Sequence, residues 1–395
     1  MSKPIPVLLY YVYRQNMMGG ARVVLNLSEL LDRERYVPIV VSQKESRLTR
    51  EARKRGVETV VLPLPPALDV YEKKALDYPL YRKVQLLKPL LAYNRRVQKV
   101  AEAHGAGIIW ARNIRAVLQV GIAAKRLGIP LIWDIALADT SRPFMRLLHS
   151  LGLLGADRVV TEAASQHEEL FGALGARLFR YKLQTINPGI DARRMAALKD
   201  GDRTSLPPGD KPSEDRSVIL TVGTLEPRKN QLMLLRALKT LVPRHPRLLA
   251  WIVGPSGDEA YRSELQDFVQ EAGLKDHVAF LGWREDIPRL MRRADIFAMS
   301  SRNEGIPYVV HEAMHTGLPI VGTEAGGMPD AIRHGETGYV APVDDVERYA
   351  AYLGRCLDDA EVRQAMGRAA RARAEKHFTA ASWAANYQRL LDTLT

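Results

Sequence analysis

The chain has 395 residues, of which 46% are hydrophobic and 26% charged, a balance typical of a globular protein with more than one core. Its single cysteine excludes a disulfide scaffold and a cysteine-built metal site, and no apolar run reaches the roughly 18 residues that span a bilayer. The net charge of +12 is uneven, because residues 1–190 hold 29 Lys and Arg against 16 Asp and Glu, whereas residues 191–395 are nearly neutral.

Short β-rich runs alternate with helical stretches through the first half of the chain. The first run lacks the long apolar stretch and cleavage site of a signal peptide, so we expect a strand there and a cytoplasmic protein. A helix from about Ala21 follows. The predicted strands are residues 7–13, 38–41, 59–62, 107–110, 129–135, 158–161 and 184–187. This alternation predicts βαβ units and a parallel sheet with helices on both faces.

The densest basic segment runs from Tyr71 to Lys99 and interleaves lysines and arginines with tyrosines and leucines. Such a segment is typical of contact with an anionic membrane surface, at the cytoplasmic face in this case. A solvated helix face beside a loop explains it equally well. No nucleic-acid recognition motif accompanies the charge, so we expect no nucleic-acid partner.

Residues 199–217 are polar and rich in proline and glycine, which predicts a linker. After it, strands again alternate with helical stretches. The predicted strands are residues 218–222, 248–253, 278–281, 295–299, 319–321 and 338–341. We therefore predict two Rossmann-like α/β domains, residues 1–198 and 218–370, which face each other across a ligand-binding cleft. Residues 371–395 are helical in pattern and are expected to pack back on the first domain.

Two glutamates flank the predicted start of a helix after the strand at 295–299. Glu304 and Gly305 form a tight loop, Pro307 suits an early helix position, and Glu312 lies about 12 Å of helical rise beyond Glu304. A helix that opens on a glycine offers free N–H groups to a phosphate. The two carboxylates are too far apart for a close catalytic pair but suit two hydroxyl-bearing parts of one extended ligand. Two glutamates on an ordinary surface helix remain the alternative.

Two further segments follow the first strand of each predicted domain. Gly223 begins a loop that carries the adjacent cations Arg228 and Lys229, which would balance the charge of a departing diphosphate without a metal. Gly19 and Gly20 precede the first helix and allow close backbone approach to a ligand. Arg228 and Lys229 are alternatively a solvated pair of surface cations. Gly19 and Gly20 are alternatively a structural turn.

Together these segments resemble retaining GT-B glycosyltransferases of family 4, also called glycosyl transferases group 1, over most of the chain. Glu304 and Glu312 match the E-x7-E motif of that family, and residues 222–230 match its diphosphate loop. Residues 187–191 resemble its N-x-G-[VI]-D turn, and residues 280–282 and 335–338 resemble two further signatures. In the first half the resemblance rests on Gly19 and Gly20.

The resemblance implies a UDP- or GDP-linked sugar donor, transfer with retention of anomeric configuration, and no metal or other cofactor. It implies that Glu304 contacts the donor sugar, that Glu312 holds the ribose hydroxyls, and that Arg228 and Lys229 bind the diphosphate. The other implied donor-binding residues are Gly19, Gly20, Gly223, Gly282, Trp283, Arg284, Gly305, Ile306, Pro307 and Tyr308. The domains are then expected to close on the donor.

One position departs from the family pattern. Many members carry a histidine at the end of a strand near the reacting sugar, but residues 130–139 contain only Asp134 and Asp139 as ionisable groups. Asp134 either orients the acceptor hydroxyl or caps its strand. His311 and His315 lie one turn apart, but no third ligand is evident, so we expect no metal there.

The acceptor is left open by the sequence: a cell-envelope glycan or lipopolysaccharide precursor, a lipid-linked saccharide and a small soluble molecule all fit. Another enzyme on the same scaffold, such as a nucleotide-sugar epimerase, is the main alternative function. A non-enzymatic protein that uses the basic half for binding is a third.

Overall fold

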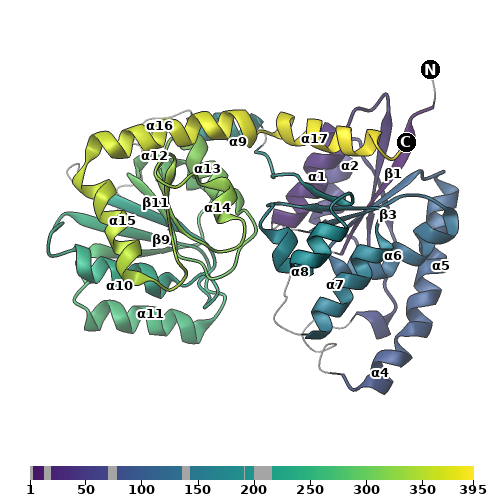
Figure 1. Ribbon diagram of the computed structural model, residues 1–395, viewed down its shortest axis with the longest axis horizontal. Coiled ribbons are helices and arrows are strands. Elements are labelled where there is room, and N and C mark those ends of the chain that lie inside the picture. The colour runs from purple at the N-terminus through teal and green to yellow at the C-terminus, as the bar shows by residue number, and fades with distance from the viewer. Residues whose placement is uncertain (1–2, 13–18, 70–77, 136–142, 191, 200–215) are drawn as a thin grey trace. The chain divides into compact units, whose positions relative to one another are not determined.

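The computed structural model describes residues 3–12, 19–69, 78–135, 143–190, 192–199 and 216–395. The chain forms two compact units, one of Met1–Ile186 with Ala384–Thr395 and the other of Asn187–Trp383 (Figure 1). The division precedes the linker predicted at 199–217, because helix α9 (Ala192–Lys199) packs on α12 and α13 of the second unit. Residues 200–215 of that predicted linker lie outside the described residues.

The first unit contains a seven-stranded parallel sheet of order β3-β2-β1-β4-β5-β6-β7. Its strands are β1 (Ile5–Tyr11), β2 (Tyr36–Ser42), β3 (Glu58–Val61), β4 (Ile108–Arg112), β5 (Leu131–Ile135), β6 (Arg158–Thr161) and β7 (Leu183–Thr185). In register, Leu8 of β1 lies beside Ile39 of β2 and Ile109 of β4. These strands are continuous apolar runs because helices cover both faces of a parallel sheet.

Eight helical segments accompany this sheet in the described part of the first unit. They are α1 (Gly19–Leu30), α2 (Arg47–Lys54), η1 (Pro66–Leu68), α4 (Leu80–Gln85), α5 (Leu87–Ala103), α6 (Ile114–Leu127), α7 (Pro143–Gly155) and α8 (Gln166–Leu178). The core includes the fully buried Trp110 and Trp133. The end of α17 (Ala380–Asp392) also belongs here, since Asp392 accepts hydrogen bonds from Arg35 and Tyr36.

The second unit contains a six-stranded parallel sheet of order β10-β9-β8-β11-β12-β13. Its strands are β8 (Ser217–Val222), β9 (Leu248–Val253), β10 (Val278–Gly282), β11 (Ile296–Met299), β12 (Ile320–Thr323) and β13 (Gly338–Ala341). The helices besides α9 are α10 (Gln231–Leu241), α11 (Glu259–Glu271), η3 (Lys275–His277), α12 (Ile287–Arg293), α13 (Tyr308–Thr316), α14 (Met328–Ala331), α15 (Val346–Asp358) and α16 (Ala360–His377).

The order of strands in the second sheet creates a switch point between β8 and β11. The chain runs outward from β8 through β9 to β10 and then returns to β11 on the other side of β8. The loops that leave β8 and β11 therefore diverge at the carboxyl edge of neighbouring strands. Open α/β sheets bind ligands at such points.

All thirteen predicted strands are present, with ends that shift by a few residues. Two details of the helices differ from the prediction. The expected C-terminal helix is two helices, α16 and α17, because Ile190 pairs with Thr379 between them. Helix α13 begins at Tyr308 and not on a glycine, since Pro307 precedes it in an extended conformation.

Candidate functional site

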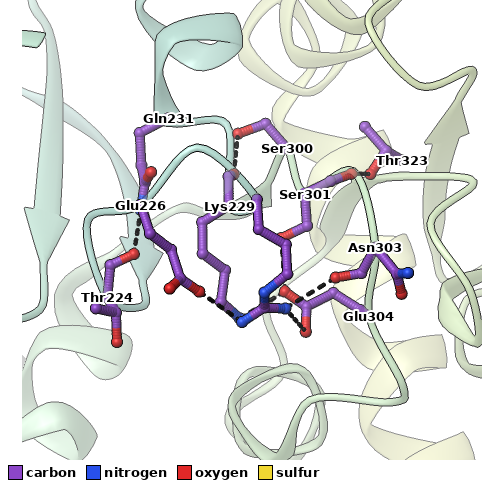
Figure 2. A network of polar contacts seen from close by, with 10 residues as sticks. Thr224, Glu226, Lys229, Gln231, Ser300, Ser301, Asn303, Glu304 and Thr323 are labelled. Carbon is purple, nitrogen blue, oxygen red and sulfur yellow. Dashed lines mark hydrogen bonds and ion pairs between the residues drawn. The ribbon is translucent and has the colours of Figure 1, made fainter. Parts of the chain in front are cut away.

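Two cations on the loop after β8 converge on one carboxylate from the loop after β11. Lys229 Nζ lies 2.5 Å from Glu304 Oε1, and Arg228 Nη1 lies 3.2 Å from Glu304 Oε2. Figure 2 shows the side chains of Lys229 and Glu304 pointing toward one another. The structure thus brings together three of the predicted site residues at the switch point of the second sheet.

Glu304 is 6% exposed and its carboxylate is held on both oxygens. Ser301 Oγ also donates to Oε1 at 2.8 Å, and Thr323 Oγ1 in turn donates to the carbonyl of Ser301 at 2.5 Å (Figure 2). A nearly buried carboxylate requires such partners, because its desolvation is otherwise unfavourable. The loop after β11 therefore holds this acid in a fixed place.

A second carboxylate occupies the other side of the Arg228 guanidinium. Arg228 Nη2 donates to Glu226 Oε1 at 2.6 Å, and Nη1 donates to the carbonyl of Asn303 at 2.9 Å. Two carboxylates, Glu226 and Glu304, therefore balance the two cations. Glu226 is partly exposed, with 31% of its side-chain surface accessible, so an incoming anion would compete with it for Arg228. The sequence interpretation missed Glu226.

Three loops are joined behind the cations by polar residues that were not among the predicted site residues. The backbone N–H of Arg302 donates to the carbonyl of Arg228 at 2.8 Å. The guanidinium of Arg302 pairs with Asp344 at 2.9 Å. Asn230 Nδ2 donates to the same carboxylate at 2.8 Å. The hydrogen bonds from Arg302 hold the pKa of Asp344 below its usual range. This arrangement fixes the backbone of the cation loop.

Glu312 lies on α13, is 2% exposed, and pairs with a residue from a distant part of the chain. Its Oε1 accepts a hydrogen bond from Arg194 Nε on α9 at 2.7 Å. The two predicted acids are thus both buried and both ion-paired, each with its own basic partners. Arg194 carries no motif signal, and sequence reasoning missed it.

The end of β10 places the residues that the resemblance assigns to the nucleotide base. Gly282 has a left-handed backbone with φ of 62°, and Trp283 is 65% exposed. Arg284 Nη2 pairs with Asp286 at 2.7 Å, and its hydrogen bonds lower the pKa of Asp286. An exposed indole beside a fixed charge pair suits stacking on a planar ligand.

Close backbone approach at the strand ends requires glycine at one position that sequence reasoning did not single out. A Cβ on Gly254, which has φ of 150°, would lie 2.0 Å from the carbonyl oxygen of Gly223. At Gly223 itself a Cβ would meet Lys229 at an ordinary 3.5 Å. Only glycine therefore fits at position 254, where the backbone of Gly223 lies too close for a side chain, whereas position 223 has room for one.

The segment before α13 packs tightly against a second glycine-containing loop. Gly305 and Ile306 are buried, and Pro307 and Tyr308 are partly exposed. A Cβ on Gly326, at φ of 52°, would lie 1.7 Å from the carbonyl oxygen of Glu304. Gly326 therefore allows the loop after β12 to support the backbone that carries Glu304.

In the first unit, Asp134 is the penultimate residue of β5 and is buried with both oxygens engaged. It pairs with Arg112 of β4 and accepts a hydrogen bond from Tyr387 of α17. Arg112 also pairs with Glu162 at 2.9 Å. This geometry fits an anchor between the sheet and the C-terminal helix, and it offers no support for the predicted acceptor-orienting role of Asp134.

Helix α1 begins at Gly19, and a Cβ on Gly20 would lie 2.7 Å from the hydroxyl oxygen of Tyr11. A side chain at position 20 would therefore require the ring of Tyr11 to shift. The adjoining residues 13–18 lie outside the described residues. A ligand contact at Gly19 and Gly20 stays a prediction.

The paired histidines of α13 serve packing. His311 stacks on Phe378 with ring centroids 4.1 Å apart, and burial lowers its pKa to about 3. In the part of the chain that the structure describes, no three His, Cys, Asp or Glu side chains gather as a metal site would require. Among the same residues, the helices are all too short or too polar to cross a membrane.

Comparison with known proteins is decisive for the family. The family model of "Glycosyl transferases group 1" matches residues 202–373, and that of "Glycosyl transferase 4-like domain" matches residues 18–183. A D-inositol 3-phosphate glycosyltransferase of Thermomonospora curvata is 30% identical over 348 residues, which cover 79% of this chain and 77% of that protein. The chain belongs to the group 1 glycosyltransferases of family 4.

Further relatives and solved structures support the same family and fold. A D-inositol 3-phosphate glycosyltransferase of Streptomyces griseus is 32% identical over 291 residues, which cover 65% of this chain but only 61% of that protein. Among solved structures, Anabaena Alr3699/HepE in complex with UDP has a TM-score of 0.81 at 21% identity, with 99% of this chain and 100% of that chain covered. A glycosyltransferase from Rickettsia africae has a TM-score of 0.80 at 16% identity, covering 100% and 99%. The glycosyltransferase therefore has the GT-B fold.

Proposed function

We propose that this glycosyltransferase moves a hexosyl group from a UDP- or GDP-linked sugar to an acceptor hydroxyl, with retention of anomeric configuration and without a metal. The observation that carries the proposal is the convergence of Arg228 and Lys229 on Glu304 at the switch point of the second sheet. The names of its relatives and the Anabaena structures with UDP and with UDP-glucose support a nucleotide-sugar donor.

The diphosphate of the donor binds at the two cations in this proposal. Lys229 and Arg228 supply the positive charge that a metal ion provides in other transferases. The diphosphate replaces Glu226 on the partly exposed Arg228, whose guanidinium suits an anion with two oxygens in reach. Trp283, Arg284 and Gly282 receive the base, and the ribose hydroxyls reach Glu312.

Transfer breaks the bond between the anomeric carbon and the β-phosphate oxygen, and the bonding pair leaves on that oxygen. Arg228 and Lys229 stabilise the charge that develops there. The acceptor oxygen forms its bond to the same face of the anomeric carbon, and its proton passes to the departing phosphate. Glu304 orients the hydroxyls of the donor sugar while this happens.

The first test is nucleotide binding by a Lys229→Met variant, measured by titration calorimetry with UDP and GDP. Loss of a hydrogen bond to a charged group weakens binding by about 1.5–3 kcal/mol. We therefore expect the dissociation constant of the preferred nucleotide to rise at least about tenfold. Lys239→Met removes an exposed lysine from the far end of α10 and serves as the matched control. Equal affinity in the two variants would contradict the proposal.

Product analysis separates transfer from the alternative of epimerisation. Incubation of the donor sugar alone should leave its stereochemistry unchanged, whereas a glycoside of unchanged anomeric configuration should form once an acceptor is added. An isomerised free donor would show an epimerase. The proposed acceptor is a glycan, a lipid-linked saccharide or a small hydroxyl compound, in cell-envelope glycan, lipopolysaccharide or glycolipid synthesis.

We also propose that the first unit contacts an anionic membrane surface. Residues 71–77 of the basic segment predicted from the sequence lie outside the described residues, but α4 and α5 bear the rest. Tyr81 and Val84 on α4 and Leu87 on α5 are each more than half exposed. Arg82, Lys83 and Lys88 stand among them in the sequence.

Helix α7 extends this apolar surface. Leu147, Leu151 and Leu154 recur at helical spacing and are 50–60% exposed, and Lys83 of α4 lies 4.2 Å from the ring of Phe144 at the start of α7. We call the exposed apolar side chains of α4, α5 and α7 the apolar face; its members are Tyr81, Val84, Leu87, Leu91, Phe144, Leu147, Leu151 and Leu154. Apolar side chains mixed with cations suit the interface of an anionic bilayer.

A further inference from the structure

The carboxylate of Glu312 is balanced by a cation that no motif includes. Its side chain is 3% exposed, and Arg194 Nε donates to its Oε1 at 2.7 Å. Among the described residues, none donates to the other oxygen, Oε2. A buried carboxylate that lost its cation would be strongly unfavourable, so Arg194 is needed wherever Glu312 stays ionised.

The helix that carries Arg194 is fixed against the helix that carries Glu312. Helix α9 packs on α12 and α13, and Arg292 Nη1 of α12 donates to the carbonyl of Ala197. The strand-like segment before α9 is held as well, since Ile190 N donates to the carbonyl of Phe378 at 3.0 Å. Arg194 thus approaches Glu312 from a backbone of defined position.

We infer that Arg194 is a positioning residue for recognition of the donor ribose. Arg194 holds Oε1 of Glu312 and thereby directs Oε2 toward the ribose hydroxyls. An ionised carboxylate has about four acceptor sites, so the guanidinium and a hydroxyl can share it. This inference rests on the proposed function, in which Glu312 contacts the ribose.

The alternative, in which the ribose displaces Arg194, is energetically poorer. Hydrogen bonds between charged partners are roughly twice as strong as those with neutral donors. If a neutral hydroxyl replaced the Arg194 guanidinium, the buried negative charge of Glu312 would lose its balancing cation. Arg194 therefore stays on Glu312 when the donor binds.

The test compares a ribonucleotide with its 2′-deoxy analogue in wild-type protein and in Arg194→Met. UDP and 2′-deoxy-UDP, and GDP and 2′-deoxy-GDP, are titrated by calorimetry, and the pair containing the tighter ribonucleotide is used. In the wild type the deoxy analogue should bind at least about tenfold more weakly, because a hydroxyl bond to a charged group is lost. In Arg194→Met the difference should shrink to less than about threefold.

Two further variants keep the inference falsifiable. Arg289→Met removes an exposed arginine of α12 and leaves the contacts of α9 and Glu312 in place, so it should discriminate like the wild type. Arg194→Lys keeps the charge and should discriminate better than Arg194→Met. Thermal unfolding confirms that each variant is folded. Unchanged discrimination in Arg194→Met, or an equal loss in Arg289→Met, would overturn the inference and leave the proposed function standing. A wild type that binds both nucleotides of the pair equally would overturn the ribose assignment of Glu312 as well, and a wild type that binds neither UDP nor GDP would overturn the proposed function.

Discussion

Single side chains at this site are held in pairs whose charges cancel. Glu304 lies between Lys229 and Arg228, Arg228 also meets Glu226, and Glu312 meets Arg194. Each pair is at least partly shielded from water, so the loss of one partner would leave the other poorly balanced. Arg228 and Glu226 are the most exposed of these side chains, so an anion can bind Arg228 there without separating the buried pairs. These pairs therefore hold the side chains in place for the diphosphate of the proposed donor.

The buried histidine beside Glu312 makes stability depend on pH. His311 has a pKa of about 3 in the folded protein because burial disfavours its charged form, with His315 and Arg373 nearby adding to the effect. In the unfolded chain the pKa returns to about 6.5. Between these two values the unfolded chain binds a proton at His311 and the folded protein does not. The free energy of unfolding therefore falls as the pH drops from about 6.5 toward 3.

We predict that His311→Phe, which retains the stacking on Phe378, removes part of this acid sensitivity. Between pH 7.5 and pH 5 the wild type should lose about 2 kcal/mol of unfolding free energy through His311 alone. The variant should lose correspondingly less over the same interval. Urea unfolding at the two pH values measures this difference, and identical losses in both proteins would show that His311 takes no part.

At the scale of elements, loops from several strands hold the backbone of the proposed donor site by close approach. The loop after β12 supports Glu304 through Gly326, and the loop after β13 supports the cations through Asp344. Both loops are separate in sequence from the residues that they support. Their backbone conformations are left-handed at Gly326 and Asp344, with φ of 52° and 64°.

Gly326→Ala should therefore damage both stability and nucleotide binding. Its Cβ would collide with the carbonyl of Glu304 and shift the carboxylate, at a cost of about 2–4 kcal/mol. Gly273→Ala is the matched control, because Gly273 has φ of 68° but nothing within 4 Å of the added Cβ. The control should lose about 1 kcal/mol and keep its affinity for nucleotide. If calorimetry showed the same affinity in both variants, the loop after β12 would have no role in placing Glu304.

The elements were largely predictable from local patterns, and the site was predictable only in part. β-branched runs such as those of β8 and β2 identify strands, and their alternation with helices identifies parallel sheets. Glu304, Glu312, Arg228 and Lys229 were found because each pair sits within one short motif. Arg194 contacts Glu312 across 118 residues of sequence, so only tertiary structure reveals it. The burial of both glutamates likewise follows from packing and not from local sequence.

On the scale of the whole molecule, the two units carry different charge and different surfaces. The excess of positive charge lies in the first half of the chain, as does the apolar face, while the second half has almost no net charge. The last residues of the chain return to the first unit, where Tyr387 is fully buried and bonded to Asp134. The proposed surface contact and the proposed donor binding therefore fall to different units.

We predict that the double variant Leu147→Glu/Leu151→Glu weakens binding to anionic vesicles at least about fivefold. Acidic residues on the apolar face remove apolar burial and add repulsion from anionic lipid, while both leucines are exposed and the fold should survive. Co-sedimentation with phosphatidylglycerol vesicles measures the effect, with phosphatidylcholine vesicles as the neutral reference. Leu30→Glu, an exposed leucine on α1, is the control variant. Equal sedimentation of the two variants, or of the wild type with both lipids, would refute membrane contact by this face.

The most direct test of the central claim is a crystal structure of the protein with an intact nucleotide sugar. UDP-glucose and GDP-mannose are the ligands to use, according to the nucleotide that binds in calorimetry. The account predicts diphosphate oxygens within about 3.2 Å of Lys229 Nζ and of the Arg228 guanidinium, with Glu304 against the sugar and Glu312 against the ribose. A nucleotide sugar bound elsewhere, with Glu226 still paired to Arg228 and no diphosphate oxygen near Lys229, would contradict it.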